Sequence, residues 1–194
     1  MYAYLQGKFV DKSPAQVYVD VSGVGYEVNI SLNTYSHIEG LEQGKLFIHL
    51  QVKEDAHVLF GFFDKAEKEI FLLLIGVSGV GAATARMMLS NLKPEEVSRA
   101  IVQGNVKLLE SVKGIGKKTA ERLVLELKDK LSKQQLSETI SPYLGNSLER
   151  DALDALIALG ISRQQAESSI KKIILAEPSV SKLEDLIKKA LKAI

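Results

Sequence analysis

The sequence predicts an α+β chain with several folded parts: a small N-terminal β-barrel, a middle all-α domain and a C-terminal three-helix bundle. Three observations lead to this prediction. In the first sixty residues apolar positions alternate with polar ones, which is the period of a half-buried strand. From Asp64 onward the spacing of apolar residues becomes helical. Within the helical part, a short segment containing two glycines occurs twice.

The composition is that of a soluble globular protein. The chain has 194 residues, of which 46% are apolar, so it can form more than one core. It has no cysteine, which excludes disulfides, thiolate metal sites and thiol nucleophiles. No apolar run approaches the roughly 20 residues needed to span a bilayer, and the start has no secretory signal. We therefore expect a cytoplasmic protein without a membrane role.

The net charge of +1 is lower than expected for a typical DNA-binding domain. The charges are unevenly distributed, however. Residues 1–63 carry 4 Lys/Arg and 7 Asp/Glu, whereas residues 64–131 carry 12 and 9. If the protein binds a polyanion, the middle of the chain is where we expect it.

Residues 1–63 are predicted to form an antiparallel barrel of about five strands, of the OB type. Val17, Val19 and Val21 alternate with polar residues, as expected of a strand with one face in a core. Turn-forming residues recur between such segments, for example at 22–25 and 40–44. A closed barrel is the simplest arrangement for strands of this length.

Residues 64–131 are predicted to be several short helices, with Asp64 and Glu67 forming a capping box at the start. This region contains the internal repeat, which reads as a helix, a four-residue hairpin and a second helix. The two copies lie 35 residues apart, so a paired motif is indicated. The hairpin residues are Ser78, Gly79, Val80 and Gly81 in the first copy and Lys113, Gly114, Ile115 and Gly116 in the second.

The hairpins have the features of a phosphate-binding site. Both glycines of each hairpin permit positive φ and a close approach by another backbone. The amides that begin the following helix point outward and can bind an anion. We expect Val80 and Ile115 to insert into the core and keep the hairpins rigid. Two ordinary glycine turns are the alternative, and the matched repeat makes that alternative less favourable.

Cationic residues follow only the second hairpin. Lys117 and Lys118, with Thr119 in the same helical turn, reinforce phosphate binding by the helix amides. Lysines in a first turn oppose the helix macrodipole, so a purely structural role is disfavoured. The first copy has Ala82 and Ala83 there, and we expect it to bind phosphate more weakly, mainly through backbone amides.

The sequence offers no catalytic constellation and no metal-ligand spacing, so we expect no enzyme activity, cofactor or metal site. Glu54 and Asp55 stand out as adjacent carboxylates at the predicted tip between two strands. They could bind a metal, act as an acid–base pair or form a solvated turn, and the residues alone favour the turn.

The last third of the chain is predicted to contain a linker and three helices. Residues 132–147 lack periodicity and are rich in Ser and Gln, which is typical of a flexible linker. In residues 148–194, Gly160 is expected to end the first helix and Ser162 with Gln165 to cap the second. This part forms a three-helix domain close to the lower size limit for independent folding.

Taken together, these features resemble the RuvA family of bacterial Holliday-junction-binding proteins. The resemblance covers the whole chain. Its motifs lie at 23–28, 53–56, 59–62, 79–81 and 114–123, and the last is the most specific. In this family the middle domain holds two helix-hairpin-helix motifs, so the resemblance assigns DNA contacts to 79–81 and 113–119.

The resemblance also implies an assembly. A tetramer or octamer would hold a four-way junction open during recombination and DNA repair, with Glu54 and Asp55 as an acidic pin near the crossover. The ATPase RuvB would bind the C-terminal domain and RuvC would be the resolving nuclease. The residues expected to contact RuvB are Leu153, Leu156, Leu159 and Ile187.

Two other functions fit the same residues less well. An OB-fold and helix-hairpin-helix repair factor would bind ordinary duplex DNA as readily as a junction. A metal-dependent nuclease would use Glu54 and Asp55, but it would need further convergent carboxylates or histidines. At Ala82 and Ala83 the chain departs from the family, where a lysine often occurs.

Overall fold

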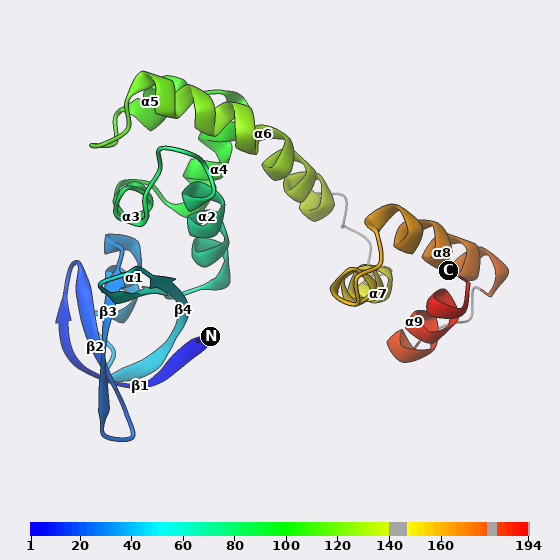
Figure 1. Cartoon of the computed structure of the whole chain (residues 1–194), viewed down its shortest axis with the longest axis horizontal. Coiled ribbons are helices and arrows are strands. Elements are labelled where there is room, and N and C mark those ends of the chain that lie inside the picture. The colour runs from blue at the N-terminus through cyan, green and yellow to red at the C-terminus, as the bar shows by residue number, and fades with distance from the viewer. Residues whose placement is uncertain (140–146, 178–181, 194) are drawn as a thin grey trace. The chain divides into compact units, whose positions relative to one another are not determined.

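The computed structural model describes residues 1–139, 147–177 and 182–193. The chain divides into two compact units, Met1–Gln134 and Gln135–Ile194. The first unit contains the barrel with the middle helices stacked on it, and the second contains the C-terminal helices (Figure 1). None of the helices in the described ranges is long and apolar enough to cross a membrane.

The predicted five-stranded OB-type barrel is confirmed, but the prediction that it is antiparallel throughout is wrong for one strand pair. It is closed, with the strand order β1-β2-β3-β5-β4, and β1 also pairs with β4. Four pairings are antiparallel and β3 with β5 is parallel. Helix α1 (Leu32–Ile38) follows the third strand. The strands are β1 (Tyr4–Ser13), β2 (Gln16–Val21), β3 (Val24–Ile30), β4 (Gln43–Val52) and β5 (His57–Phe62).

Alternation along the strands builds the barrel core. In β2 the side chains of Val17 and Val19 are buried, whereas Tyr18 between them is exposed. Apolar side chains therefore fill the interior from each strand and from α1. The buried cluster consists of Leu5, Phe9, Val17, Val19, Val28, Ile30, Ile38, Leu46 and Ile48.

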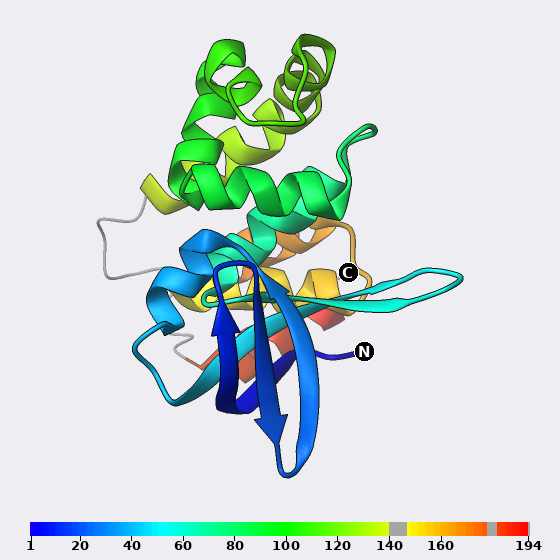
Figure 2. The same ribbon diagram turned by 90° about the vertical axis from the view of Figure 1, so that its left-hand side faces the viewer.

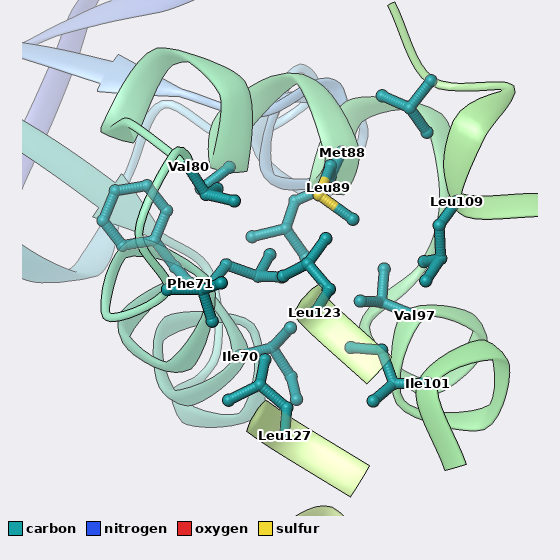
Figure 3. Close-up of a cluster of buried hydrophobic side chains, with 14 of the residues drawn as sticks. Ile70, Phe71, Val80, Met88, Leu89, Val97, Ile101, Leu109, Leu123 and Leu127 are labelled. Atoms are coloured by element: carbon teal, nitrogen blue, oxygen red, sulfur yellow. The ribbon is translucent and has the colours of Figure 1, made fainter. Parts of the chain in front are cut away.

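The middle helices form a second core, to which the barrel contributes. Phe60 and Phe62 of β5 pack on Phe71, with ring centroids 5.2 and 4.8 Å apart. Figure 3 shows the helical part of this cluster, in which Val80 of the first hairpin points toward Leu89 and Leu123. The helices are α2 (Lys65–Ile75), α3 (Ala82–Asn91), α4 (Pro94–Gln103), α5 (Val106–Glu110) and α6 (Lys117–Thr139).

Half of the predicted capping box at the start of α2 is confirmed. The Asp64 carboxylate accepts a hydrogen bond from the Glu67 amide at 2.7 Å. The Glu67 side chain turns instead into the barrel–helix contact, where it is fully buried. It accepts hydrogen bonds from the Ser31 hydroxyl and from Thr34 Oγ1, the latter at 2.7 Å. The prediction missed these contacts because both partners lie more than thirty residues away in sequence.

The predicted linker begins too early. Helix α6 runs on to Thr139, eight residues into the range predicted as linker, and residues 140–146 lie outside the described part of the chain. Lys, Gln, Leu and Glu at 133–138 are good helix formers, so a polar composition there is compatible with a continuing helix.

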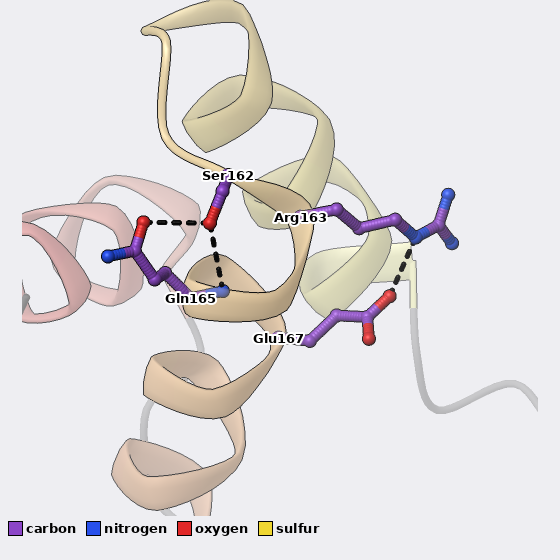
Figure 4. Close-up of polar contacts among 4 residues, drawn as sticks. All are labelled: Ser162, Arg163, Gln165 and Glu167. Carbon is purple, nitrogen blue, oxygen red and sulfur yellow. Dashed lines mark hydrogen bonds and ion pairs between the residues drawn. The ribbon is translucent and has the colours of Figure 1, made fainter.

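The second unit contains the predicted helices, α7 (Ser147–Ala158), α8 (Arg163–Ala176) and α9 (Leu183–Lys192). Gly160 follows α7 with φ +90°. The Ser162 hydroxyl caps α8, because it accepts from the Gln165 amide at 3.4 Å and donates to Gln165 Oε1 at 2.7 Å (Figure 4). Arg163 and Glu167 form an ion pair at 2.8 Å on the same helix. The predicted helix stop at Gly160 and the predicted cap at Ser162 are thus both confirmed.

We expect Glu67→Gln to gain stability relative to the natural chain as the pH rises. Burial raises the pKa of the Glu67 carboxyl above its ordinary 4.5, so the folded state binds this proton more tightly than the unfolded chain does. The contribution of such a group to stability is complete below the pKa that it has in the unfolded chain. It is lost as the pH rises through the higher pKa that the group has in the folded protein. Glutamine stays neutral throughout. Thermal unfolding over a pH series measures the difference between the two midpoints, and a difference independent of pH would contradict this account.

Candidate nucleic-acid interface

The two copies of the repeat adopt the same backbone structure. In the first, the Val80 amide donates to the Val77 carbonyl at 3.0 Å, and in the second the Ile115 amide donates to the Val112 carbonyl at the same distance. The helix that follows each hairpin starts alike, with Ala85 bonded to Gly81 at 2.9 Å and Ala120 to Gly116 at 3.0 Å. The sequence repeat therefore corresponds to two hairpins with the same turn and helix-start hydrogen bonds. The residues predicted to plug the core do so, because Val80 and Ile115 are each only 5% exposed.

The four hairpin glycines have two different roles. Gly79 and Gly114 have φ of +92° and +95°, a conformation that side chains with a Cβ adopt only with strain. Gly81 has φ −84° and is the N-cap of α3. Both glycines of each hairpin permit positive φ, but only the first of each pair adopts it. A Cβ at Gly81 or Gly116 would have no neighbour within 4 Å, so these positions are open to an approaching ligand.

The hairpins lie next to each other in a reciprocal arrangement. A Cβ built on Gly79 would lie 3.9 Å from Thr119 in the second copy, and one built on Gly114 would lie 3.9 Å from Thr84 in the first. Thr84 and Thr119 are equivalent positions of the repeat. Arg122 adds a link, since its guanidinium donates to the Ser78 carbonyl at 3.3 Å. The two helix starts thus form one continuous surface.

Backbone amides are available on this surface. Gly81 supplies no side chain to cap α3, and within the described residues no side-chain oxygen accepts from the amides of its first turn. Because the first amides of a helix have no partner inside the helix, they are free to bind an anion.

Positive charge gathers at the second hairpin. The side chains of Lys113, Lys117 and Lys118 are all exposed, and Thr119 is half-buried beside them. The equivalents of Lys117 and Lys118 in the first copy differ, because Ala82 is only 6% exposed and belongs to the core whereas Ala83 faces solvent. A lysine would be tolerated at 83 but not at 82.

A shallow hollow lies between the first hairpin and α6. Two residues of this hollow, Glu121 and Arg122, belong to the 114–123 motif, but the sequence did not lead us to predict a function for either. Arg122 follows Lys118 by one helical turn, which puts both on the same face and is the signal that could have identified it. The lining residues are Ser78, Gly79, Lys118, Thr119, Glu121, Arg122 and Leu125.

Glu54 and Asp55 occupy the turn between β4 and β5, and both are exposed. The turn is closed by a hydrogen bond of 2.8 Å from the Lys53 amide to the Ala56 carbonyl. The β4–β5 hairpin projects well beyond the body of the barrel (Figure 2). The two carboxylates therefore stand at the end of a protruding arm.

The predicted partner-binding residues of the second unit differ in exposure. Leu156 is fully buried in the core of the unit, so its assignment to a partner surface is not supported. Leu153 and Ile187 are partly buried against that core, and Leu159 is 62% exposed. The phase of α7 explains the difference, because Leu156 faces α8 and α9 while Leu159 lies beyond the helix end. The core consists of Ala152, Leu156, Ala166, Ile170, Ile173, Leu186 and Ala190.

Models of three protein-family domains match most of the chain. A model of the RuvA N-terminal domain matches residues 1–61, a model of a SAM-like helix-hairpin-helix tandem matches 71–129, and a model of the RuvA C-terminal domain matches 147–194. These ranges contain the barrel, the paired hairpins and the C-terminal helices.

Curated relatives carry the name Holliday junction branch migration complex subunit RuvA. The protein from Christiangramia forsetii is 47% identical over the whole of both chains, and that from Flavobacterium psychrophilum is 47% identical over 99% of each. The Bacteroides fragilis protein is 42% identical over the whole of both. The chain therefore belongs to the RuvA family.

Proposed function

We propose that this protein is the DNA-binding, non-catalytic subunit of a branch migration complex and that it grips the phosphate backbones of a four-way junction. The observation that carries this proposal is the pair of hairpins placed side by side, with free helix amides and exposed lysines on one surface. The names of the relatives support the same role. Amides and lysines bind phosphate without reading bases, so recognition depends on DNA structure rather than sequence.

The acidic turn gives the proposed surface its selectivity. In a tetramer, or an octamer of two tetramers, four or more copies of Glu54 and Asp55 would lie near the centre of the junction. Carboxylates there repel phosphates and disfavour a continuous duplex across the middle. A junction with an open centre avoids that repulsion.

The C-terminal unit would recruit the motor. The exposed Leu159, with the partly buried Leu153 and Ile187, offers an apolar surface of the kind that protein partners cover. RuvB would bind there and drive ATP-dependent branch migration, and RuvC would cleave the same junction. We place this assembly in the cytoplasm.

Replacing Lys117 and Lys118 with alanine should weaken junction binding and flatten its salt dependence. Each lost phosphate contact lowers the slope of log affinity against log salt by about 0.9 on duplex DNA. Lys171→Ala with Lys172→Ala is the matched control, since this exposed lysine pair lies in α8. Fluorescence titrations at several salt concentrations measure the slopes. Equal slopes for the two double variants would show that Lys117 and Lys118 do not contact the DNA.

The two glycines of the second hairpin should respond differently to alanine. Gly114→Ala forces a side chain into positive φ, which costs about 1–2 kcal/mol of stability. Gly116→Ala meets no neighbour in the protein, so the melting temperature should hold while the added methyl obstructs the phosphate and weakens binding. Calorimetry and DNA titration measure the two effects. Full DNA affinity in the Gly116→Ala variant would contradict the proposed surface.

Changing Glu54→Gln together with Asp55→Asn should reduce selectivity and leave the fold intact. Affinity for the junction should be preserved or rise, and affinity for linear duplex should rise more, because the central repulsion is gone. Glu184→Gln with Asp185→Asn provides a control pair of the same residues, also exposed. A junction-to-duplex ratio unchanged at two salt concentrations would exclude the pin, and loss of a metal-dependent cleavage activity would favour a nuclease instead.

A further inference from the structure

Helices α3 and α6, the second helices of the two repeats, differ in what their equivalent faces contact. On α3 this face carries Arg86 and Ser90, and both contact the barrel. The residues 35 positions later on α6 are Glu121 and Leu125, and both are exposed, Leu125 by 83%. The motif folds with either pair, so Arg86 is not needed to form the repeat. Its role lies in the contact with the barrel.

Arg86 joins α3 to two parts of the barrel. One guanidinium nitrogen, Nη1, donates to the carbonyl of Ala15, between β1 and β2, at 2.9 Å. It also donates to the side-chain oxygen of Asn29, in β3, at 2.9 Å. One turn further along α3, the Ser90 hydroxyl accepts from the Leu32 amide at 3.0 Å. These bonds hold both the direction and the rotation of the helix against the barrel.

Asn29 extends this contact toward the acidic turn. Its side-chain amide accepts from Arg86 and donates to the Leu59 carbonyl of β5 at 3.4 Å. An arginine can only donate and a carbonyl can only accept, so the two partners fix the orientation of the amide. The strand β5 begins at His57, two residues after Asp55. A continuous path of hydrogen bonds therefore leads from α3 to the strand that follows the acidic turn.

The other end of α3 is the first hairpin. Gly81 is the N-cap of the helix, and Arg86 lies five residues later. Because a helix of this length is rigid, the contact that orients Arg86 also orients the hairpin. We propose that Arg86, acting through Asn29, is a positioning residue that fixes the first hairpin relative to the acidic turn and so sets the preference for four-way over linear DNA. This inference rests on the proposed function, which supplies the two DNA structures to be distinguished.

The test compares Arg86→Met with Arg99→Met. Methionine keeps an unbranched apolar stem and removes the donors, and both variants lose one positive charge from the helical part. Arg99 is exposed on α4. The ratio of four-way to linear affinity should fall about threefold to tenfold in Arg86→Met, a range typical of residues that transmit coupling through hydrogen-bond networks. Arg99→Met should keep the natural ratio, and Arg86→Lys should recover part of it.

The outcomes separate this inference from the proposed function. If the natural chain itself shows no preference for four-way DNA, the proposed function fails. If the natural chain is selective and Arg86→Met matches Arg99→Met, the positioning role of Arg86 is overturned. Affinity of Arg86→Met for linear duplex should change by less than about twofold beyond the control, because the lysines of the second hairpin are intact. A loss of both affinities in parallel would also overturn it.

A second measurement needs no DNA. The chain has no cysteine, so Ser78→Cys and Ala56→Cys place spin labels specifically at the first hairpin and beside the acidic turn. Labelled chain is mixed with excess unlabelled chain, so that distances within one chain dominate. We expect a narrow distance distribution in the parent and in Arg99→Met and a broader or shifted one in Arg86→Met. Identical distributions would refute the positioning role even if Arg86→Met binds DNA poorly.

Discussion

The contact between β5 and α2 determines how the first unit is built. Phe60 and Phe62 pack on Phe71, so the barrel and the middle helices share one apolar cluster. Glu67 adds direction to this packing, because a buried carboxyl is stable only where its hydrogen-bond donors are in place. Both donors lie at the start of α1, which follows β3 of the barrel. Apolar packing alone would allow small rotations, whereas these bonds favour one orientation. The paired hairpins and the acidic turn are thereby held in one frame.

The two copies of the helix-hairpin-helix motif together form the proposed DNA-binding surface. Because their sequences have diverged, each copy contributes differently to it. The hairpin and helix-start hydrogen bonds of the two copies correspond, but Arg86 of α3 contacts the barrel, whereas the lysines at the start of α6 are exposed. The first copy therefore contributes geometry and backbone amides, and the second contributes most of the charge. A chain with a net charge of only +1 can bind a polyanion in this way, because its cations are local and its carboxylates stand at the end of a projecting hairpin.

Local patterns were sufficient to predict much of this structure. Alternation in β2, the offset of 35 residues and the capping signals at Ser162 led to the barrel, the paired motif and the second unit. Three features were not predicted, and only the last of them lies beyond the reach of a local pattern. Gly81 adopts negative φ because it caps a helix. Leu156 and Leu159 differ in burial through the phase and end of α7. Arg86 meets partners 57 and 71 residues away, which no local pattern can indicate.

The central claim is that the barrel and the middle helices behave as one cooperative body, which keeps the hairpins and the acidic turn in fixed relation. Native-state hydrogen exchange tests it most directly, because amides that open together share one opening free energy. The amides of β5 and of α2 should exchange with the same free energy and the same denaturant dependence. Exchange of the α2 amides at a distinctly lower free energy, with β5 still protected, would contradict the account.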